Sequence, residues 1–123
     1  MLKYIELKSG YNDNGPAWIG RVQQSRTGRT VYFNGMALRR HNGIGANFVD
    51  TVSGDRYWVS GVKRNGNDRH WAGSGRVLVE ADAVADYLAI VDATELDPRH
   101  FAVTHDVKPT EPADFVALEN QPG

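Results

Sequence analysis

Short apolar runs recur along the chain as far as residue 80, and each is closed by a glycine or asparagine turn signal. The runs are rich in Val, Ile, Tyr, Phe, Trp and Thr, and they follow one another at the spacing of about 8–12 residues that is typical of an antiparallel sheet. We therefore expect strands over residues 2–8, 18–24, 29–34, 36–40, 47–52, 56–64 and 76–80.

Turn residues indicate how these runs are connected. Ser25-Arg26-Thr27-Gly28 predicts a hairpin between the second and third runs, and Asn34-Gly35 turns the chain into the fourth. Ser53-Gly54 predicts a tight reversal. Asn65-Gly66 lies between the last two runs, so it predicts that 56–64 and 76–80 pair as a hairpin.

The run over 56–64 carries apolar groups on both faces. Trp58 and Val62 fall on one face, and Tyr57 and Val59 on the other. Strands of this kind suit a closed or strongly curled sheet better than a flat sheet with one wet side. We expect Trp58, like Trp18, to lie in the core.

The apolar period changes after residue 80. Apolar residues recur at i, i+3, i+4 and i+7 from Val84 to Val91, which predicts a helix over 82–92 with Asp82 as its cap. Because a curled sheet leaves an edge uncovered, we expect this helix to cover an open end or edge of the barrel.

The pattern is lost beyond residue 92. Asp97-Pro98 ends any helix, and acidic residues with Pro109, Pro112 and Pro122 indicate an extended, acidic tail. On this view a chain ending near Thr94 still folds. The alternative is that residues 101–107 form an edge strand that completes the sheet.

These patterns predict one fold class. The expected structure is mainly β: a small antiparallel β-barrel or curled sheet of SH3-like or OB-like size, with one C-terminal helix. We expect a single β-rich domain over 1–95, including the covering helix at 82–92, and an acidic C-terminal segment over 96–123. A chain of 123 residues with 41% hydrophobic residues is long enough for one core and too short for a second.

The net charge of −1 conceals an uneven distribution. Residues 1–76 carry twelve Lys and Arg against five Asp and Glu, a net charge of +7, while residues 77–123 carry two against ten, a net charge of −8. This asymmetry favours a basic body that binds an anionic partner and an acidic end that competes for the same surface. The alternative is that the two halves attract each other within one fold.

Several kinds of chemistry are excluded or unsupported. The absence of cysteine excludes disulfides, thiolate metal sites and thiol nucleophiles. His41, His70, His100 and His105 have no recognised ligand spacing, and no phosphate-binding loop motif is complete, so we expect no metal and no cofactor. The charged N-terminus is not a secretory signal, and no segment reaches the roughly 18 apolar residues of a membrane helix. A cytoplasmic protein without a membrane partner is the expectation.

Arginine beside aromatic residues is the strongest functional signal. Planar guanidinium groups bind phosphate or carboxylate, and flat rings stack on bases, a combination that small barrels use on single-stranded nucleic acid. We therefore predict a non-enzymatic binding module for single-stranded nucleic acid or an acidic protein segment. The candidate binding residues are Arg56, Arg64, Arg69, His70, Trp71 and Arg76.

Two other classes of function stay open. Asp68, His70 and Ser74 would be the centre of a small hydrolase-like enzyme, although no strand-to-helix elbow surrounds the serine. A structural or assembly protein would instead pair its oppositely charged halves between copies. The sequence contains no signal for the oligomeric state.

Five stretches carry a recognisable pattern, namely residues 3–7, 10–20, 25–35, 57–63 and 68–73. They resemble a group of small bacterial proteins that has no known activity. The resemblance covers about residues 2–80 and ends before the acidic segment.

Members of that group sometimes carry the name 1-deoxy-D-xylulose-5-phosphate synthase, which is a large thiamine-diphosphate enzyme. The cofactor motif of such a synthase opens with Gly-Asp-Gly, whereas the nearest match here is Gly54-Asp55-Arg56 in a predicted turn. A chain of 123 residues also has no room for the cofactor domains. The resemblance therefore implies neither a cofactor nor an activity.

Overall fold

The computed structural model describes residues 1–11, 15–69 and 75–115. Within these residues the chain forms nine strands, one α-helix and two short 3₁₀ helices. The strands are β1 Leu2–Leu7, β2 Ala17–Arg21, β3 Gln23–Gln24, β4 Thr30–Phe33, β5 Met36–Arg40, β6 Phe48–Asp50, β7 Arg56–Gly61, β8 Val77–Glu80 and β9 Phe101–Thr104. The helix α1 spans Val84–Val91, and the 3₁₀ helices η1 and η2 span Ala81–Ala83 and Pro112–Phe115.

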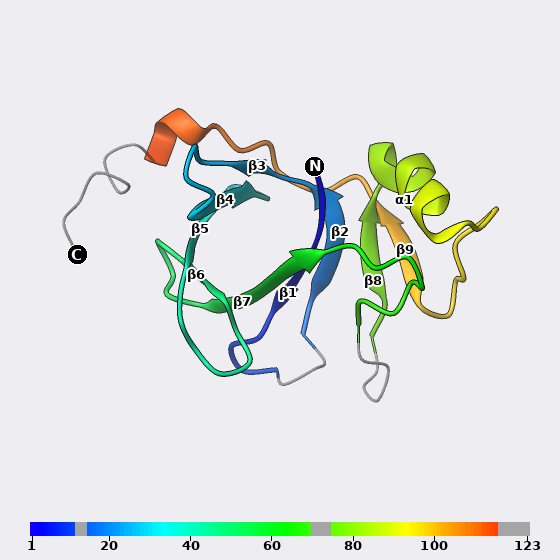
Figure 1. The fold of residues 1–123 in the computed structure, drawn as a ribbon, viewed down its shortest axis with the longest axis horizontal. Helices are drawn as coiled ribbons and strands as arrows, with labels where there is room; N and C mark the ends of the chain where they lie inside the picture. Colours follow the sequence, from blue (N-terminus) through cyan, green and yellow to red (C-terminus); the bar gives the residue numbers. More distant parts are fainter. Residues whose placement is uncertain (12–14, 70–74, 116–123) are drawn as a thin grey trace.

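All nine strands belong to one sheet, in the order β3-β4-β5-β6-β7-β1-β2-β8-β9 (Figure 1). The pairs from β3 to β2 are antiparallel, whereas β8 pairs in parallel with both β2 and β9. The prediction of a mainly β, curled sheet with one helix is confirmed. The two parallel pairs were not predicted.

The curl of the sheet follows from how β2 continues into β3. Only Val22 separates the two strands along the chain, yet β3 lies at one edge of the sheet and β2 lies six positions away. The sheet must therefore bend round until its β3 edge meets the end of β2, which makes a half-barrel (Figure 1). Val22 is buried at this bend, and its N–H donates to the carbonyl of Met1 at 3.0 Å.

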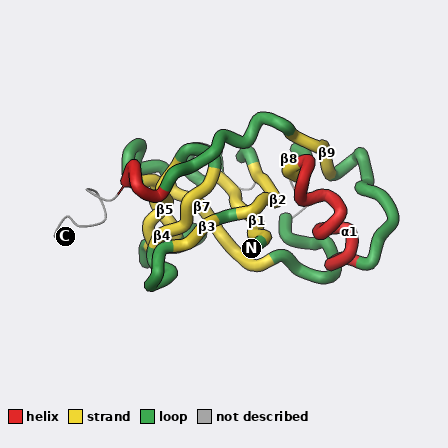
Figure 2. The backbone as a smooth tube through the Cα atoms, turned by 90° about the horizontal axis from the view of Figure 1, so that it is seen from above, coloured by secondary structure: helices red, strands yellow, loops and turns green. Residues whose placement is uncertain are grey.

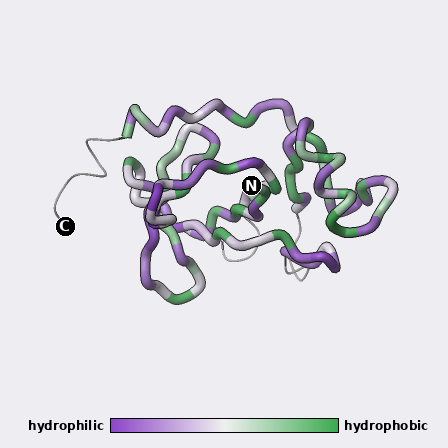
Figure 3. The backbone as a smooth tube through the Cα atoms, turned by 45° about the horizontal axis from the view of Figure 1, so that its top comes forward, coloured by the Kyte–Doolittle hydropathy of each residue, from purple (hydrophilic) through white to green (hydrophobic). Residues whose placement is uncertain are grey.

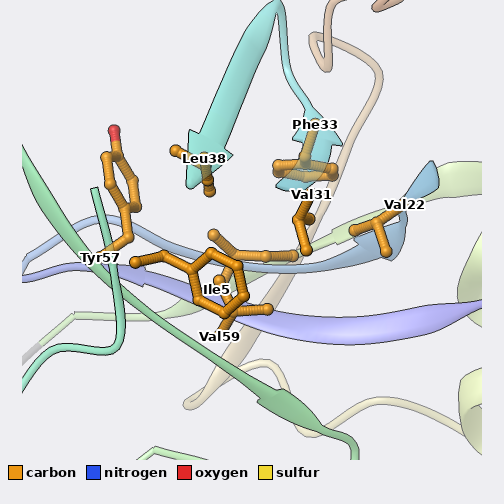
Figure 4. Close-up of a cluster of buried hydrophobic side chains, with 8 residues drawn as sticks. Ile5, Val22, Val31, Phe33, Leu38, Tyr57 and Val59 are labelled. Carbon is orange, nitrogen blue, oxygen red and sulfur yellow. The ribbon is translucent and has the colours of Figure 1, made fainter. Parts of the chain in front are cut away.

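Two apolar cores lie on opposite faces of the sheet. Because side chains alternate along β1, Ile5 points into the half-barrel and Tyr4 points to the outer face. Figure 4 shows the inner core, where side chains from several strands point toward one another; it consists of Ile5, Val22, Val31, Phe33, Leu38, Phe48, Tyr57 and Val59. The outer core consists of Tyr4, Ala17, Ile19, Val77, Val79 and Tyr87.

The helix covers the outer core and not the open end of the barrel. Its predicted apolar stripe is confirmed, since Tyr87 is buried and Val84 and Val91 pack against the outer core. The predicted cap is wrong: Ala83 precedes the helix, and no side chain caps it. Asp82 lies one residue before Ala83, within η1, where its carbonyl accepts a hydrogen bond from Arg21 Nη2 at 2.9 Å.

The predicted hairpin between 56–64 and 76–80 is wrong. Asn65-Gly66 does turn the chain, with Gly66 at φ 73°, but β7 already has β6 and β1 on its two edges. No edge of β7 is left for β8. The chain therefore leaves β7 on the outer side, where Val62 packs against the outer core, and β8 joins the sheet beyond β1 and β2.

The chain after α1 returns to the sheet. Phe101–Thr104 pairs in parallel with Val77–Glu80, so the structure has the strand that the alternative interpretation placed at 101–107. The ring of Phe101 lies 5.6 Å from that of Tyr87 on α1. Residues 97–104 are thus part of the folded domain, whereas 116–123 of the predicted tail lie outside the described residues.

Residues 105–115, here named the strap, run from β9 across the half-barrel (Figure 2), and most of them are hydrophilic (Figure 3). Lys108 N–H donates to Asn34 Oδ1 at 2.9 Å, and Thr110 Oγ1 accepts from Gly35 N–H at 2.6 Å. The ring of Phe115 lies 6.1 Å from that of Tyr32. The strap is therefore held to the β4–β5 turn by a few specific contacts.

None of the helices among the described residues has both the length and the apolar composition that crossing a membrane requires.

Candidate functional site

Three of the predicted binding arginines are exposed but lie apart. Arg56 begins β7 and Arg64 follows its end, so they lie at opposite ends of a strand about 17 Å long. Arg76 precedes β8, which is three strands from β7, or about 14 Å across the sheet. Arg56, Arg64 and Arg76 therefore do not form one surface.

Arg69 is buried, with 3% of its surface exposed. Its guanidinium donates to the carbonyl of Gly15 and, at 3.4 Å, to the carbonyl of Gly75. These bonds tie the connection that follows β7 to the loop before β2 and to the start of β8. Arg69 stabilises the crossing connection and presents no guanidinium to solvent.

The residues of the alternative enzymatic site are only partly visible. Asp68 is half-buried, and its Oδ1 accepts the N–H of Lys63 at 2.9 Å. Burial raises the pKa of this carboxyl, against the lowering effect of that hydrogen bond. The predicted site residues His70, Trp71 and Ser74 lie outside the described residues.

Metal ligands do not gather in the described part of the chain. Within residues 1–11, 15–69 and 75–115, no three His, Asp or Glu side chains are placed to hold a metal ion.

A cluster of arginines that was not among the predicted site residues lies at the open end of the β4–β5 hairpin, opposite its turn. Asn34 and Gly35, at φ 52° and 74°, form its two-residue turn, which pairs Phe33 with Met36 and fixes the register of the whole hairpin. That register places Arg29 opposite Arg40, where Arg40 N–H donates to the Arg29 carbonyl at 2.7 Å.

The hairpin end is hollowed into an open cavity. Its volume is about 290 Å³, and it is lined by Arg29, Arg39, Arg40 and Asn42. All three arginines are exposed. The guanidinium of Arg40 lies 5.9 Å from the centre of the Phe48 ring, which holds it at the rim of the inner core.

A fourth arginine, Arg56, extends this cluster along the outer face of the sheet. Arg39 pairs with Val49, and Val49 pairs with Arg56, so the three side chains form one row across β5, β6 and β7. With strands about 4.8 Å apart, Arg39 and Arg56 are about 10 Å apart. We name Arg29, Arg39, Arg40 and Arg56 the arginine surface.

The arginine surface is not neutralised within the described residues. The ion pairs of Lys8, Arg21 and Arg99 lie elsewhere, and no described carboxylate pairs with any of the four arginines. Asp50 pairs with Leu38 and so lies on the opposite face of the sheet from Arg39 and Arg56. Asp55 lies in the turn before β7, and neither carboxylate forms an ion pair with an arginine of the described residues. The positive charges are therefore available to a ligand.

Trp58 stands beside this surface. It lies two residues after Arg56 on β7 and hence on the same face, and 38% of its surface is exposed. The prediction that Trp58 belongs to the core is wrong, because the outer core lies beneath α1, over β1, β2 and β8, and does not extend to it. Trp18 is partly buried against the inner core, with its ring 6.1 Å from that of Phe33.

This arrangement can bind anions. Guanidinium groups bind phosphate and carboxylate in bidentate fashion and keep their charge at all physiological pH values. The cavity is lined by three arginines and an amide, none of which is a nucleophile or a general base.

The pairing of Arg29 with Arg40 could have been read from the sequence. A two-residue turn at Asn34-Gly35 pairs residues that stand equally far on either side of it. The signal is weaker than the density of arginine and tryptophan over 56–76, from which the predicted binding residues come.

No protein-family model, no curated protein and no solved structure matches this chain.

Proposed function

We propose that the protein is a non-enzymatic binding module that holds an anionic ligand on the arginine surface. The observation that carries the proposal is the open cavity lined by Arg29, Arg39 and Arg40, whose charges no described carboxylate neutralises. Exposed, like-charged side chains repel one another at short range, so a cluster of this kind favours an anion between them.

The surface also differs from the other basic positions of the chain. Arg69 is buried against main-chain carbonyls, and Arg21 and Arg99 are paired with carboxylates. Arg64 and Arg76 are exposed but isolated from one another. In the described part of the chain, the arginine surface brings together several guanidinium groups that have no carboxylate partner.

The test uses heparin as a generic polyanion and compares two double variants that remove the same charge. Arg39→Gln with Arg40→Gln should weaken heparin binding about four- to 25-fold, because each exposed charge contact contributes up to about 1 kcal/mol. Arg64→Gln with Arg76→Gln should leave the affinity within about twofold. Affinity is measured by titration at low and at physiological salt, and melting curves confirm that both variants fold.

The control pair separates this proposal from the site predicted by sequence. Equal weakening by both pairs would mean that heparin responds only to net charge. A loss confined to the Arg64 and Arg76 pair would place the ligand on the crossing connection. Either result would overturn the assignment to the arginine surface.

A further inference from the structure

The outer face beside the arginine surface combines charge with an exposed ring. Trp58 and Arg56 share one face of β7 and are about 7 Å apart along the strand. Among the described residues, Trp58 makes no ring contact with another aromatic side chain, and it belongs to neither core. The exposed part of its indole, on a residue with 38% of its surface exposed, is therefore open to a flat partner.

The carboxylate that faces Trp58 across the strand pair does not oppose an anionic ligand. Glu6 pairs with Trp58 across β1 and β7, but only 3% of its surface is exposed. Its Oε1 accepts the hydroxyl of Tyr4 at 2.5 Å, and its Oε2 lies 2.8 Å from Lys8 Nζ. The charge opposite Trp58 is thus buried and paired.

We infer that the ligand of the arginine surface is a single-stranded nucleic acid, whose phosphates lie along Arg39 and Arg56 and one of whose bases stacks on Trp58. This inference rests on the proposed function and adds the class of ligand to it. Stacking needs a base that is not enclosed in a duplex, and it is indifferent to sequence because every base has a flat face.

Other polyanions match the surface less completely. An acidic peptide or heparin gains from the arginines but has no planar group for the indole. A duplex offers more charge, but its bases are stacked and paired within the helix. Only an unpaired strand uses Trp58 and the arginines together.

The test measures binding of a labelled oligothymidylate of about 12 nucleotides, within the site sizes of single-strand-binding barrels, and of heparin. Trp58→Ala should weaken the oligonucleotide about five- to 150-fold, the effect of losing one stacked base, and leave heparin affinity unchanged. Trp58→Phe should retain most of the affinity, because it keeps a ring. Arg39→Gln should weaken the binding of both ligands. It should also reduce the slope of log K against log salt concentration for the oligonucleotide by about 0.7, the contribution of one phosphate contact.

The outcomes distinguish the two proposals. If heparin binds through the arginine surface but Trp58→Ala leaves oligonucleotide affinity unchanged, the inference fails and the proposed function stands. The inference would also be overturned if polyglutamate, or the duplex of the oligothymidylate with its complement, bound more tightly than the single-stranded oligothymidylate. If neither heparin nor the oligonucleotide binds, the proposed function itself fails. If Trp58→Ala does not fold, Trp58→Leu, which keeps an apolar side chain but has no flat ring, takes its place and should show the same loss of oligonucleotide affinity beside an unchanged heparin affinity.

Discussion

At the scale of single residues, two glycines on either side of Lys3 have opposite surroundings. Gly20 on β2 and Gly61 on β7 both pair with Lys3. A Cβ at Gly20 would collide with Glu80 Oε1 and with the ring of Phe33 in the inner core, whereas a Cβ at Gly61 would meet nothing within 4 Å. Only Gly20 is required by packing.

We expect Gly20→Ala to destabilise the protein by about 1–3 kcal/mol, because the Phe33 ring is buried and cannot move aside without disturbing the inner core. Gly61→Ala is the matched control and should be neutral or stabilising by up to about 1 kcal/mol, through the smaller entropy of the unfolded chain. Urea unfolding measures both. Equal stability of the two variants would contradict the packing at Gly20.

Asp68 is a residue that costs stability when charged. Burial raises its pKa in the folded protein, and its Oδ2 is buried without a hydrogen-bond partner among the described residues. A raised folded-state pKa means that the folded state binds the proton more tightly than the unfolded chain. The associated stability is present at low pH and is lost as pH rises through the folded-state pKa.

Asp68→Asn should therefore stabilise the protein at neutral pH, by about 1 kcal/mol, because the amide oxygen still accepts the N–H of Lys63 and the buried charge is gone. The advantage should shrink as the pH is lowered toward the pKa of the carboxyl. Chemical unfolding at several pH values gives both quantities. A variant that is less stable than the native protein at neutral pH would show that the charge itself is needed.

At the scale of elements, β9 joins the C-terminal part of the chain to both the sheet and the helix. It pairs with β8 over four residues, and Phe101 contacts Tyr87 in the outer core. Without β9, the edge of β8 would be unpaired and the outer core would lose one wall. This contrasts with the sequence-based view in which everything beyond Asp97 was a loose tail.

A chain ending at Thr94 should accordingly be unfolded or insoluble, whereas a chain ending at Phe115 should fold with a melting temperature close to that of the full chain. Circular dichroism and size-exclusion chromatography of the two products make the comparison. A folded, soluble 1–94 fragment would show that β9 is dispensable. In that case the tail hypothesis, with tighter polyanion binding by the shortened chain, would return.

At the scale of the whole molecule, buried tyrosines stabilise both cores only while they are neutral. Burial, together with the charges of Asp50 and Asp55, raises the pKa of Tyr57 in the inner core to about 12. Burial and the charge of Asp68 raise that of Tyr87 in the outer core to about 12. The pKa of Tyr4 is raised further, by burial and by its hydrogen bond to Glu6.

The folded state thus holds these phenol protons more tightly than the unfolded chain, whose tyrosines titrate near pH 10. Their contribution to stability is complete below about pH 10 and is lost as the pH rises through about 12. We expect phenolate absorbance and loss of circular dichroism to appear together in an alkaline titration. If most of the five tyrosines formed phenolates while the protein stayed folded, the burial of Tyr4, Tyr57 and Tyr87 would be contradicted.

The opposite charges of the two halves meet within the fold at one described place. Arg21 on β2 lies 2.7 Å from Asp86 on α1, through Nη2 and Oδ2. Both side chains are exposed, so the pair contributes little to stability. The charge asymmetry is thus better explained by the unpaired arginines on the far side of the half-barrel than by attraction between the halves.

The sequence by itself determined the elements and the two faces of the strands. Period-two alternation, the turn residues at 25–28, 34–35 and 53–54, and the apolar stripe of α1 are local signals, and each is set by backbone sterics or by burial of neighbours in the chain. The hairpin register that pairs Arg29 with Arg40 belongs to this class, even though the sequence analysis did not use it.

The tertiary structure decided everything that depends on which strand edges were free. The edges of β7 were taken by β6 and β1, so the chain after Asn65-Gly66 led to β8 beyond β1 and β2, and Arg69 in this connection was buried against the carbonyl of Gly15. The same crossing separated Arg56 from Arg76, and the row through Val49 joined Arg56 to Arg39. The order of strands in a sheet depends on which edges remain unpaired in the whole fold. A local sequence pattern therefore does not predict it.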